Sequence, residues 1–171
     1  KLGTQMKAVG EVMSIGKTYK EALQKAIRSL EIGRYGLGFA KNFNQLSLSE
    51  LLAKLKEPSS ERQFIMYEAL RKGAEIEELH QLTKIKPWFI QQMKELVLLE
   101  EEILKYKGSA LPDKLLIQAK KDGFSDRYLS LLLNIPEEKI RKQRVKLGLN
   151  KAWETIPVSG IENAGYYFST Y

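Results

Sequence analysis

Apolar side chains recur at helical spacing through most of the chain, from about residue 46 to residue 147. The longest such stretch runs from Trp88 to Tyr106, where apolar residues fall three and four positions apart with polar residues between them. That period is typical of a helix with one buried face. The pattern predicts a mainly α fold, with a multi-helix domain over residues 46–155.

Local start and stop signals divide this region into separate helices. A serine followed three positions later by Glu or Gln predicts helix starts at Ser47 and Ser60, and Ser125 predicts another start. Prolines at positions 87, 112 and 136 suit the first turn of a helix. The predicted ends are glycines, because a glycine readily adopts the left-handed conformation that stops a helix: Gly73, Gly108, Gly123 and Gly148.

The first 33 residues have a different pattern. Residues 1–16 read as an extended segment that is apolar on both faces, which predicts a covered strand ending at Gly16. Thr18 is placed to cap a following helix, which Gly33 ends. Glycines are frequent in residues 33–45, and this segment is the best candidate for a linker between two domains.

The long helix has more apolar surface than one buried face needs. Its main stripe is joined by Leu98, which points the opposite way, and by Trp88 and Leu99 at the flanks. Such a helix is either central in its own domain or in contact with another chain. Central burial is the favoured reading of the helix as a whole, and Trp88, Leu98 and Leu99 are the candidates for self-association.

Composition excludes several kinds of site. The 171 residues include no cysteine and a single histidine, His80, so thiolate chemistry and sites with two histidines are excluded. No apolar run approaches the ~18 residues of a membrane span. Acidic runs at residues 77–78 and 100–102 are predicted to be solvated, because neighbouring residues on a helix point in different directions. We expect no metal site and no catalytic residue in this chain.

Two segments resemble functional motifs. Gly16-Lys17-Thr18 looks like the end of a phosphate-binding loop, but five residues separate Gly10 from Gly16 where that loop has four. We interpret it as a turn between a strand and a helix.

The second segment, residues 125–147, has helix-turn-helix spacing, and Lys139, Lys142 and Lys146 share one face of its second helix. The net charge of +7 permits contact with nucleic acid. However, the helix begins with two glutamates, where base-reading helices favour Asn, Gln and Arg. A nucleic-acid-binding module is therefore the alternative hypothesis, and a solvated helical corner is favoured.

Several blocks, in order along the chain, resemble the large subunit of glutamine-dependent carbamoyl-phosphate synthetase. Residues 4–16 (TQMKAVGEVMSIG) and the helix after them resemble the end of its carboxyphosphate domain. The blocks WF at 88–89, ELVLLE at 95–100, KDGFSD at 121–126 and EKIR at 138–141 resemble its helical oligomerisation domain. YFSTY at 167–171 resembles the segment before its second synthetase half. Three departures are Ala8 in place of a frequent Ser, a short stretch at 158–164, and no ATP-grasp core before residue 1.

The resemblance implies a division of the chain into four parts. Residues 1–33 would be the tail of the carboxyphosphate ATP-grasp domain, an α/β unit, and 34–45 a linker. Residues 46–155 would be the oligomerisation domain, and 156–171 a connector to the second half. The chain would then be an interior piece of a longer protein.

The resemblance also implies a function for the intact enzyme. That enzyme is a cytoplasmic ligase serving arginine and pyrimidine biosynthesis, which makes carbamoyl phosphate from bicarbonate, glutamine-derived ammonia and two ATP, with Mg²⁺ and K⁺. Its catalytic residues would lie outside this chain, which alone would be inactive and hold no cofactor. The implied partners are other large subunits and the small glutaminase subunit, with no membrane contact. Met6 and Val9 would line the ammonia conduit, although plain core packing explains them equally well.

Overall fold

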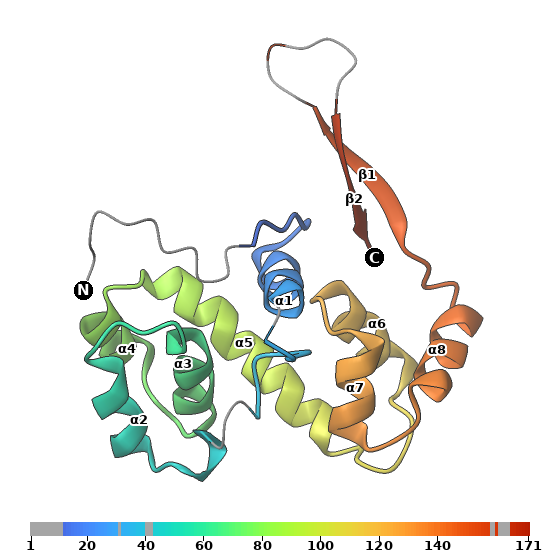
Figure 1. The fold of residues 1–171 in the computed structure, drawn as a ribbon. Coiled ribbons are helices and arrows are strands. Elements are labelled where there is room, and N and C mark those ends of the chain that lie inside the picture. The colour runs from blue at the N-terminus through green and yellow to red at the C-terminus, as the bar shows by residue number, and fades with distance from the viewer. Residues whose placement is uncertain (1–11, 31, 40–42, 158–159, 161–164) are drawn as a thin grey trace.

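The computed structural model describes residues 12–30, 32–39, 43–157, 160 and 165–171. The fold within these residues is mainly α, as predicted. Helix α5 crosses the molecule, with α2, α3 and α4 packed at one end and α6, α7 and α8 near the other (Figure 1). Helix α1 lies beside α5 between these two groups. The helices are α1 (Tyr19–Ser29), α2 (Leu48–Leu55), α3 (Arg62–Arg71), α4 (Ile76–Thr83), α5 (Pro87–Leu104), α6 (Asp113–Lys121), α7 (Asp126–Leu133) and α8 (Glu137–Lys146), with a 3₁₀ turn, η1 (Phe43–Gln45).

Most of the predicted helix boundaries are confirmed. Ser47 forms the full capping box with Glu50, Thr18 accepts a hydrogen bond from the Glu21 amide, and Ser125 caps α7. The cap predicted at Ser60 is wrong. Helix α3 instead follows a helical turn at residue 61 and has no side-chain cap. The glycines predicted as helix ends all have positive φ: Gly33, Gly73, Gly108, Gly123 and Gly148.

One continuous core joins the helices. Helix α5 supplies Ile90, Met93, Leu96, Val97 and Ile103, all with exposed fractions of 3% or less. They share this core with buried residues of α2, α3, α4 and α7, and α5 directly contacts α3, α4 and α7. The helix is therefore central in its domain, as the width of its apolar stripe indicated.

The strand predicted over residues 1–16 is not found in its described part. Residues 12–16 carry no strand pairing, and residues 1–11 lie outside the described part. A strand needs a neighbour for its backbone hydrogen bonds. The two strands that the structure describes, β1 (Ala152–Pro157) and β2 (Gly165–Thr170), pair only with each other, antiparallel, with residue 152 opposite 170.

The β1–β2 hairpin was not foreseen. It projects from the end of α8 and returns toward α1 (Figure 1). The connector predicted over residues 156–171 contains the end of β1 and all of β2. The returning strand carries the chain from α8 back to the N-terminal helix, and this places residues far apart in sequence at one seam.

Candidate functional site

Two of the three side chains proposed for self-association lie on the outside of α5. Trp88 is 55% exposed and Leu98 is 57% exposed, whereas Leu99 is half-buried and packs against the core. Trp88 also contacts Phe89 and the ring of Tyr19 on α1, with ring centroids 5.0 and 5.6 Å away. The apolar side chains of this helix most open to a second chain are therefore Trp88 and Leu98, and we call the surface that they form the α5 outer face. Met6 and Val9 lie outside the described residues.

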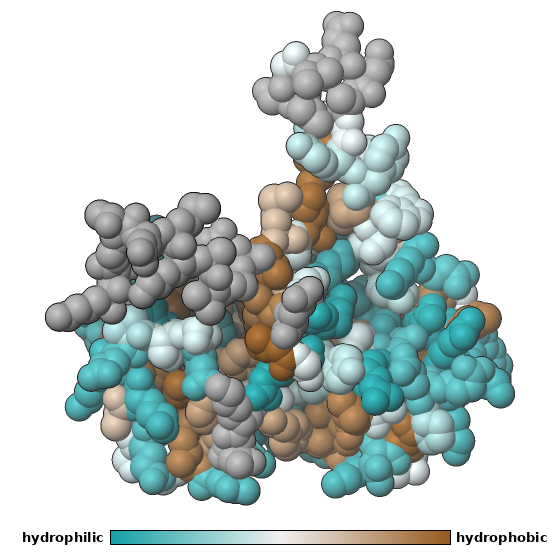
Figure 2. All heavy atoms as spheres, viewed as in Figure 1, coloured by the Kyte–Doolittle hydropathy of each residue, from teal (hydrophilic) through white to brown (hydrophobic). Residues whose placement is uncertain are grey.

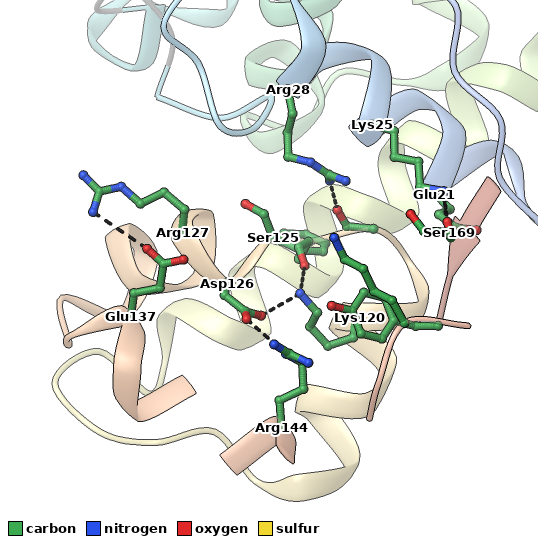
Figure 3. A pocket seen from close by; sticks show the side chains of 14 residues that line it. Glu21, Lys25, Arg28, Lys120, Ser125, Asp126, Arg127, Glu137, Arg144 and Ser169 are labelled. Carbon is green, nitrogen blue, oxygen red and sulfur yellow. Dashed lines mark hydrogen bonds and ion pairs between the residues drawn. The ribbon is translucent and has the colours of Figure 1, made fainter. Parts of the chain in front are cut away.

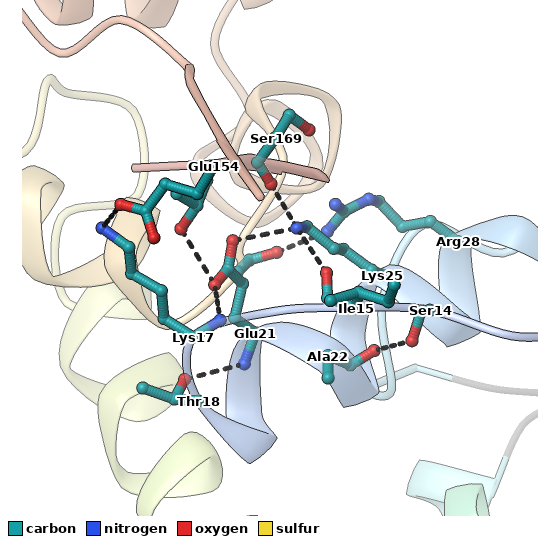
Figure 4. A network of polar contacts seen from close by, with 12 residues as sticks. Ser14, Ile15, Lys17, Thr18, Glu21, Ala22, Lys25, Arg28, Glu154 and Ser169 are labelled. Carbon is teal, nitrogen blue, oxygen red and sulfur yellow. Dashed lines mark hydrogen bonds and ion pairs between the residues drawn. The ribbon is translucent and has the colours of Figure 1, made fainter. Parts of the chain in front are cut away.

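The resemblance to a phosphate-binding loop is not matched by the geometry. The Lys17 amide donates a 2.8 Å hydrogen bond to Glu21, and the Lys17 ammonium lies 2.5 Å from Glu154 on β1 (Figure 4). The Lys17 amide, which a phosphate-binding loop would offer to its phosphate, is thus already bound by the Glu21 carboxylate. Within the described ranges no group of three His, Cys, Asp or Glu residues is arranged to hold a metal ion.

The helix-turn-helix segment is a packed corner. Asn134 takes the left-handed conformation between α7 and α8, and Ile140 is buried against the rest of the domain. Lys139, Lys142 and Lys146 are exposed, and hydrophilic residues dominate the surface over α8 (Figure 2). This arrangement fits the solvated face that the sequence favoured.

A buried polar cluster lies where the sequence predicted a solvated acidic run. The Glu100 side chain has no exposed surface and accepts hydrogen bonds from Tyr67 at 2.7 Å and Tyr128 at 2.9 Å. Its other oxygen is paired with Arg71, which is also 3.3 Å from the buried Glu68. The prediction that residue 100 is solvated is therefore wrong, whereas its neighbours at 101 and 102 are exposed.

Burial and the neighbouring groups act in opposite directions on the pKa of Glu100. Burial raises the pKa of Glu100, although Arg71 and the two phenols oppose the shift by stabilising the carboxylate. Burial and the nearby Glu100 carboxylate raise the pKa of Tyr67 and Tyr128 well above their ordinary value. The phenols therefore remain donors, and Glu100 stays an acceptor paired with a guanidinium.

The cluster holds the glycine-rich segment onto the helices. The Gly38 amide donates to the Tyr128 hydroxyl at 3.1 Å, and the Phe39 amide donates to Glu68 at 3.2 Å. A side chain at position 38 would collide with Glu100 and with the Tyr128 hydroxyl. The segment predicted as a linker is thus anchored along residues 36–39, with Leu37 only 1% exposed.

A second polar cluster joins α1 to the C-terminal half of the chain. Lys120, 3% exposed, donates to the Phe124 carbonyl at 2.8 Å and to Asp126 at 2.7 Å. Arg144 of α8 donates to the other oxygen of Asp126 at 3.0 Å, and its guanidinium lies over the Tyr171 ring. Burial lowers the pKa of Lys120 to about 8, despite the adjacent carboxylate.

Asp126 is held in its charged form by these two cations. Burial alone would raise its pKa, but the hydrogen bonds and charges of Lys120 and Arg144 outweigh burial and lower the pKa. On the α1 side, Lys25 donates to the Ser169 carbonyl, and Thr170 donates to Glu21 at 3.1 Å (Figure 4). The seam between α1, α6–α8 and β2 is therefore closed by charged groups.

Comparisons with known proteins agree with one family. The model described as "Carbamoyl-phosphate synthetase large chain, oligomerisation domain" matches residues 11–148. A carbamoyl phosphate synthase large chain of Archaeoglobus fulgidus is 42% identical over 99% of this chain and 16% of its own length. N-terminal sections of the large chain from Methanopyrus kandleri and Aquifex aeolicus are 38% and 41% identical, over 33% and 30% of their lengths. The chain thus spans at most about a third of these relatives.

Proposed function

The chain belongs to the carbamoyl-phosphate synthetase large-chain family, and from this premise we propose that it serves as the oligomerisation segment of such a large chain. The observation that carries the proposal is the match of residues 11–148 to the oligomerisation-domain model, a range that contains all of α1 to α8. The function is therefore structural, within an enzyme that makes carbamoyl phosphate from bicarbonate, glutamine-derived ammonia and two ATP.

The α5 outer face supports contact with a second large chain. Trp88 and Leu98 leave more than half of their surface exposed although they belong to the central helix of the core. Burial of one leucine at a contact contributes about 2 kcal/mol, and a two-fold symmetric interface counts each residue twice. A few such side chains can therefore stabilise a weak dimer.

Sedimentation velocity of the chain and two variants tests this surface. Leu98→Asp places a charge on the α5 outer face, and Leu131→Asp makes the same change on α7, where the leucine is 53% exposed. We expect the unmodified chain and Leu131→Asp to associate with increasing concentration, and Leu98→Asp to remain monomeric. A monomeric unmodified chain, or equal association of all three, would place the contact elsewhere.

The described residues do not fit the ATP, Mg²⁺ and K⁺ that the family resemblance implies for the intact enzyme. No cluster of carboxylates among them is arranged for a cation, and the candidate phosphate loop is engaged by Glu21 and Glu154. These groups belong to other parts of the large chain in this proposal. The small glutaminase subunit, the cytoplasmic location and the supply of arginine and pyrimidine synthesis follow from the resemblance alone. Among the described residues, no helix is long and apolar enough to cross a membrane.

A separate part of the proposal is that Met6 and Val9 line the ammonia conduit. It follows from the resemblance of residues 4–16 to the family block beside that conduit. In a full-length enzyme, a charged replacement at Val9 should lower glutamine-dependent synthesis while ammonia-dependent synthesis persists. A parallel fall of both activities, with folding intact, would assign Val9 to the core.

A further inference from the structure

A cation-rich hollow of about 250 Å³ lies where α1, the α6–α7 turn, α8 and the end of β2 meet (Figure 3). Three carboxylates and six cations line it, which leaves an excess of three positive charges. The cations come from four separate parts of the chain: Lys25, Arg28, Lys120, Arg127, Arg144 and Lys151. Such convergence of like charges is unfavourable unless a counter-charge offsets it.

The three carboxylates do not supply that counter-charge in full. Asp126 is shared between Lys120 and Arg144, as described above. Glu21 lies 3.0 Å from Lys25 and also accepts two hydrogen bonds from uncharged donors. The third carboxylate is 4.0 Å from Arg127, at the limit of an ion pair.

Arg28 and Lys151 are the cations left over. Arg28 donates a hydrogen bond to the Gly123 carbonyl, and no described carboxylate is within ion-pair distance of Arg28 or Lys151. Burial lowers the pKa of the Arg28 guanidinium, and the nearby Tyr171 and Glu21 oppose this shift only in part. Figure 3 shows Arg28 reaching from α1 toward the loop that precedes α7.

We propose that this hollow binds a compact anion that carries a phosphate group, with Arg28 and Lys151 as its charged donors. A dianionic phosphate offsets most of the excess charge, and its oxygens accept hydrogen bonds from several directions, whereas a carboxylate has two oxygens in one plane. One water occupies about 30 Å³, so the hollow has room for a phosphate and a small organic group. The ligand would bridge α1 and the C-terminal half of the domain.

Titration of the ¹⁵N-labelled chain with inorganic phosphate tests the site, at constant ionic strength set with sodium chloride. Amide resonances of residues 123–127 and the side-chain Nε–H of Arg28 should shift and saturate. Arg28→Gln should weaken phosphate binding about tenfold, the effect of losing one charge-assisted hydrogen bond. Arg141→Gln removes the same charge from the exposed face of α8 and should leave the affinity nearly unchanged.

A second variant and a second anion serve as further tests of the site. Lys151→Gln changes an exposed side chain, so it should fold normally and weaken binding severalfold. Acetate at the same ionic strength should bind more weakly than phosphate. Shifts that do not saturate, equal affinity in Arg28→Gln and Arg141→Gln, or acetate binding as tight as phosphate would each overturn the proposal.

Discussion

The hydroxyl of Tyr67 donates a 2.7 Å hydrogen bond to Glu100, a fully buried carboxylate 33 residues further along the chain. The bond joins α3 to α5 inside the core. A buried carboxylate that loses its partners costs several kcal/mol. The cluster around Glu100 is therefore expected to contribute strongly to the stability of the domain.

Replacement of Glu100 tests this contribution. Glu100→Ala leaves two buried phenols without their acceptor and Arg71 with only Glu68 and Glu101, so we expect the free energy of unfolding to fall by about 3–5 kcal/mol. Glu102→Ala is the matched control, because Glu102 is exposed in the same acidic run, and its effect should stay within about 0.5 kcal/mol. Urea denaturation followed by circular dichroism measures both, and similar losses would contradict the structural assignment.

Gly123 combines a conformational and a packing requirement. Its φ is +93°, and a Cβ there would lie 3.0 Å from the Glu21 Cα on α1. Gly123→Ala should lower the free energy of unfolding by about 2–3 kcal/mol, from left-handed strain and displacement of α1. Gly148→Ala has open space around its Cβ at φ +68°, so it should show only the strain, about 1 kcal/mol. Equal losses in urea denaturation would show that α1 packs loosely on this turn.

Because Lys120 is buried, we predict that the free energy of unfolding rises in mild alkali. Its pKa falls from an ordinary 10.5 to about 8, so between these values the unfolded chain binds more protons and unfolding becomes harder as pH rises. Below pH 8 both states are protonated and the burial penalty is fully present. The groups that face Lys120 are Asp126 on α7, Arg144 on α8, Arg28 on α1 and Tyr171.

The rise should be on the order of 2 kcal/mol between pH 8 and pH 10. Above pH 10 stability should fall again, because the raised pKa values of Tyr67 and Tyr128 mean that the unfolded chain loses those protons first. Lys120→Met should remove the rise, whereas Lys121→Met, on an exposed neighbour, should retain it. The midpoint of urea denaturation, measured across this pH range, tests the prediction. A midpoint that does not change with pH in the unmodified chain would show that burial of the Lys120 ammonium costs no stability.

The chain alone should neither hydrolyse ATP nor make carbamoyl phosphate. The Lys17 amide and ammonium are engaged by Glu21 and Glu154, so no phosphate cradle is open at the turn before α1. Phosphate release from ATP with Mg²⁺ and bicarbonate should equal that of a buffer control. Bicarbonate-dependent release above that control would contradict the structural role.

Duplex DNA should bind only weakly and without sequence preference. Lys139, Lys142 and Lys146 offer an exposed basic face, and contacts to phosphates alone are lost steeply as salt increases. Fluorescence anisotropy with two unrelated duplexes should give equal affinities that vanish near ~200 mM salt. Tight binding to one sequence at that salt would favour the helix-turn-helix alternative.

The helices were predictable because their signals are local. The Ser47 capping box and the alternation of apolar and polar residues in α5 act within a few residues, so the sequence displays them directly. Glu100 was missed because the three consecutive glutamates look alike. Its helical phase was the available signal, since it follows Leu96 by four positions and precedes Ile103 by three, which puts it on the buried stripe.

The β1–β2 hairpin and the contact between α1, α6–α8 and β2 depend on residues far apart in the sequence, so no short stretch of sequence predicts them. Residues 152–157 and 165–170 are rich in aromatic and β-branched side chains, a strand signal, but neither has the single apolar face of a half-buried strand. The burial of Lys120 depends on Tyr171 and Arg144, which the fold brings to it from later elements. Charged residues with such distant partners look like surface residues in sequence.

The bond between Thr170 and Glu21 spans 149 residues and has a consequence for synthesis of the chain. Ribosomes add roughly 5–20 residues per second, so Glu21 emerges on the order of 10 s before its partner exists. Helices α2 to α5 contact one another directly and can pack during that interval. Helix α1 precedes these helices in the chain, yet it acquires its polar partners from β2 last, and until then the Glu21 carboxylate lacks its Thr170 donor.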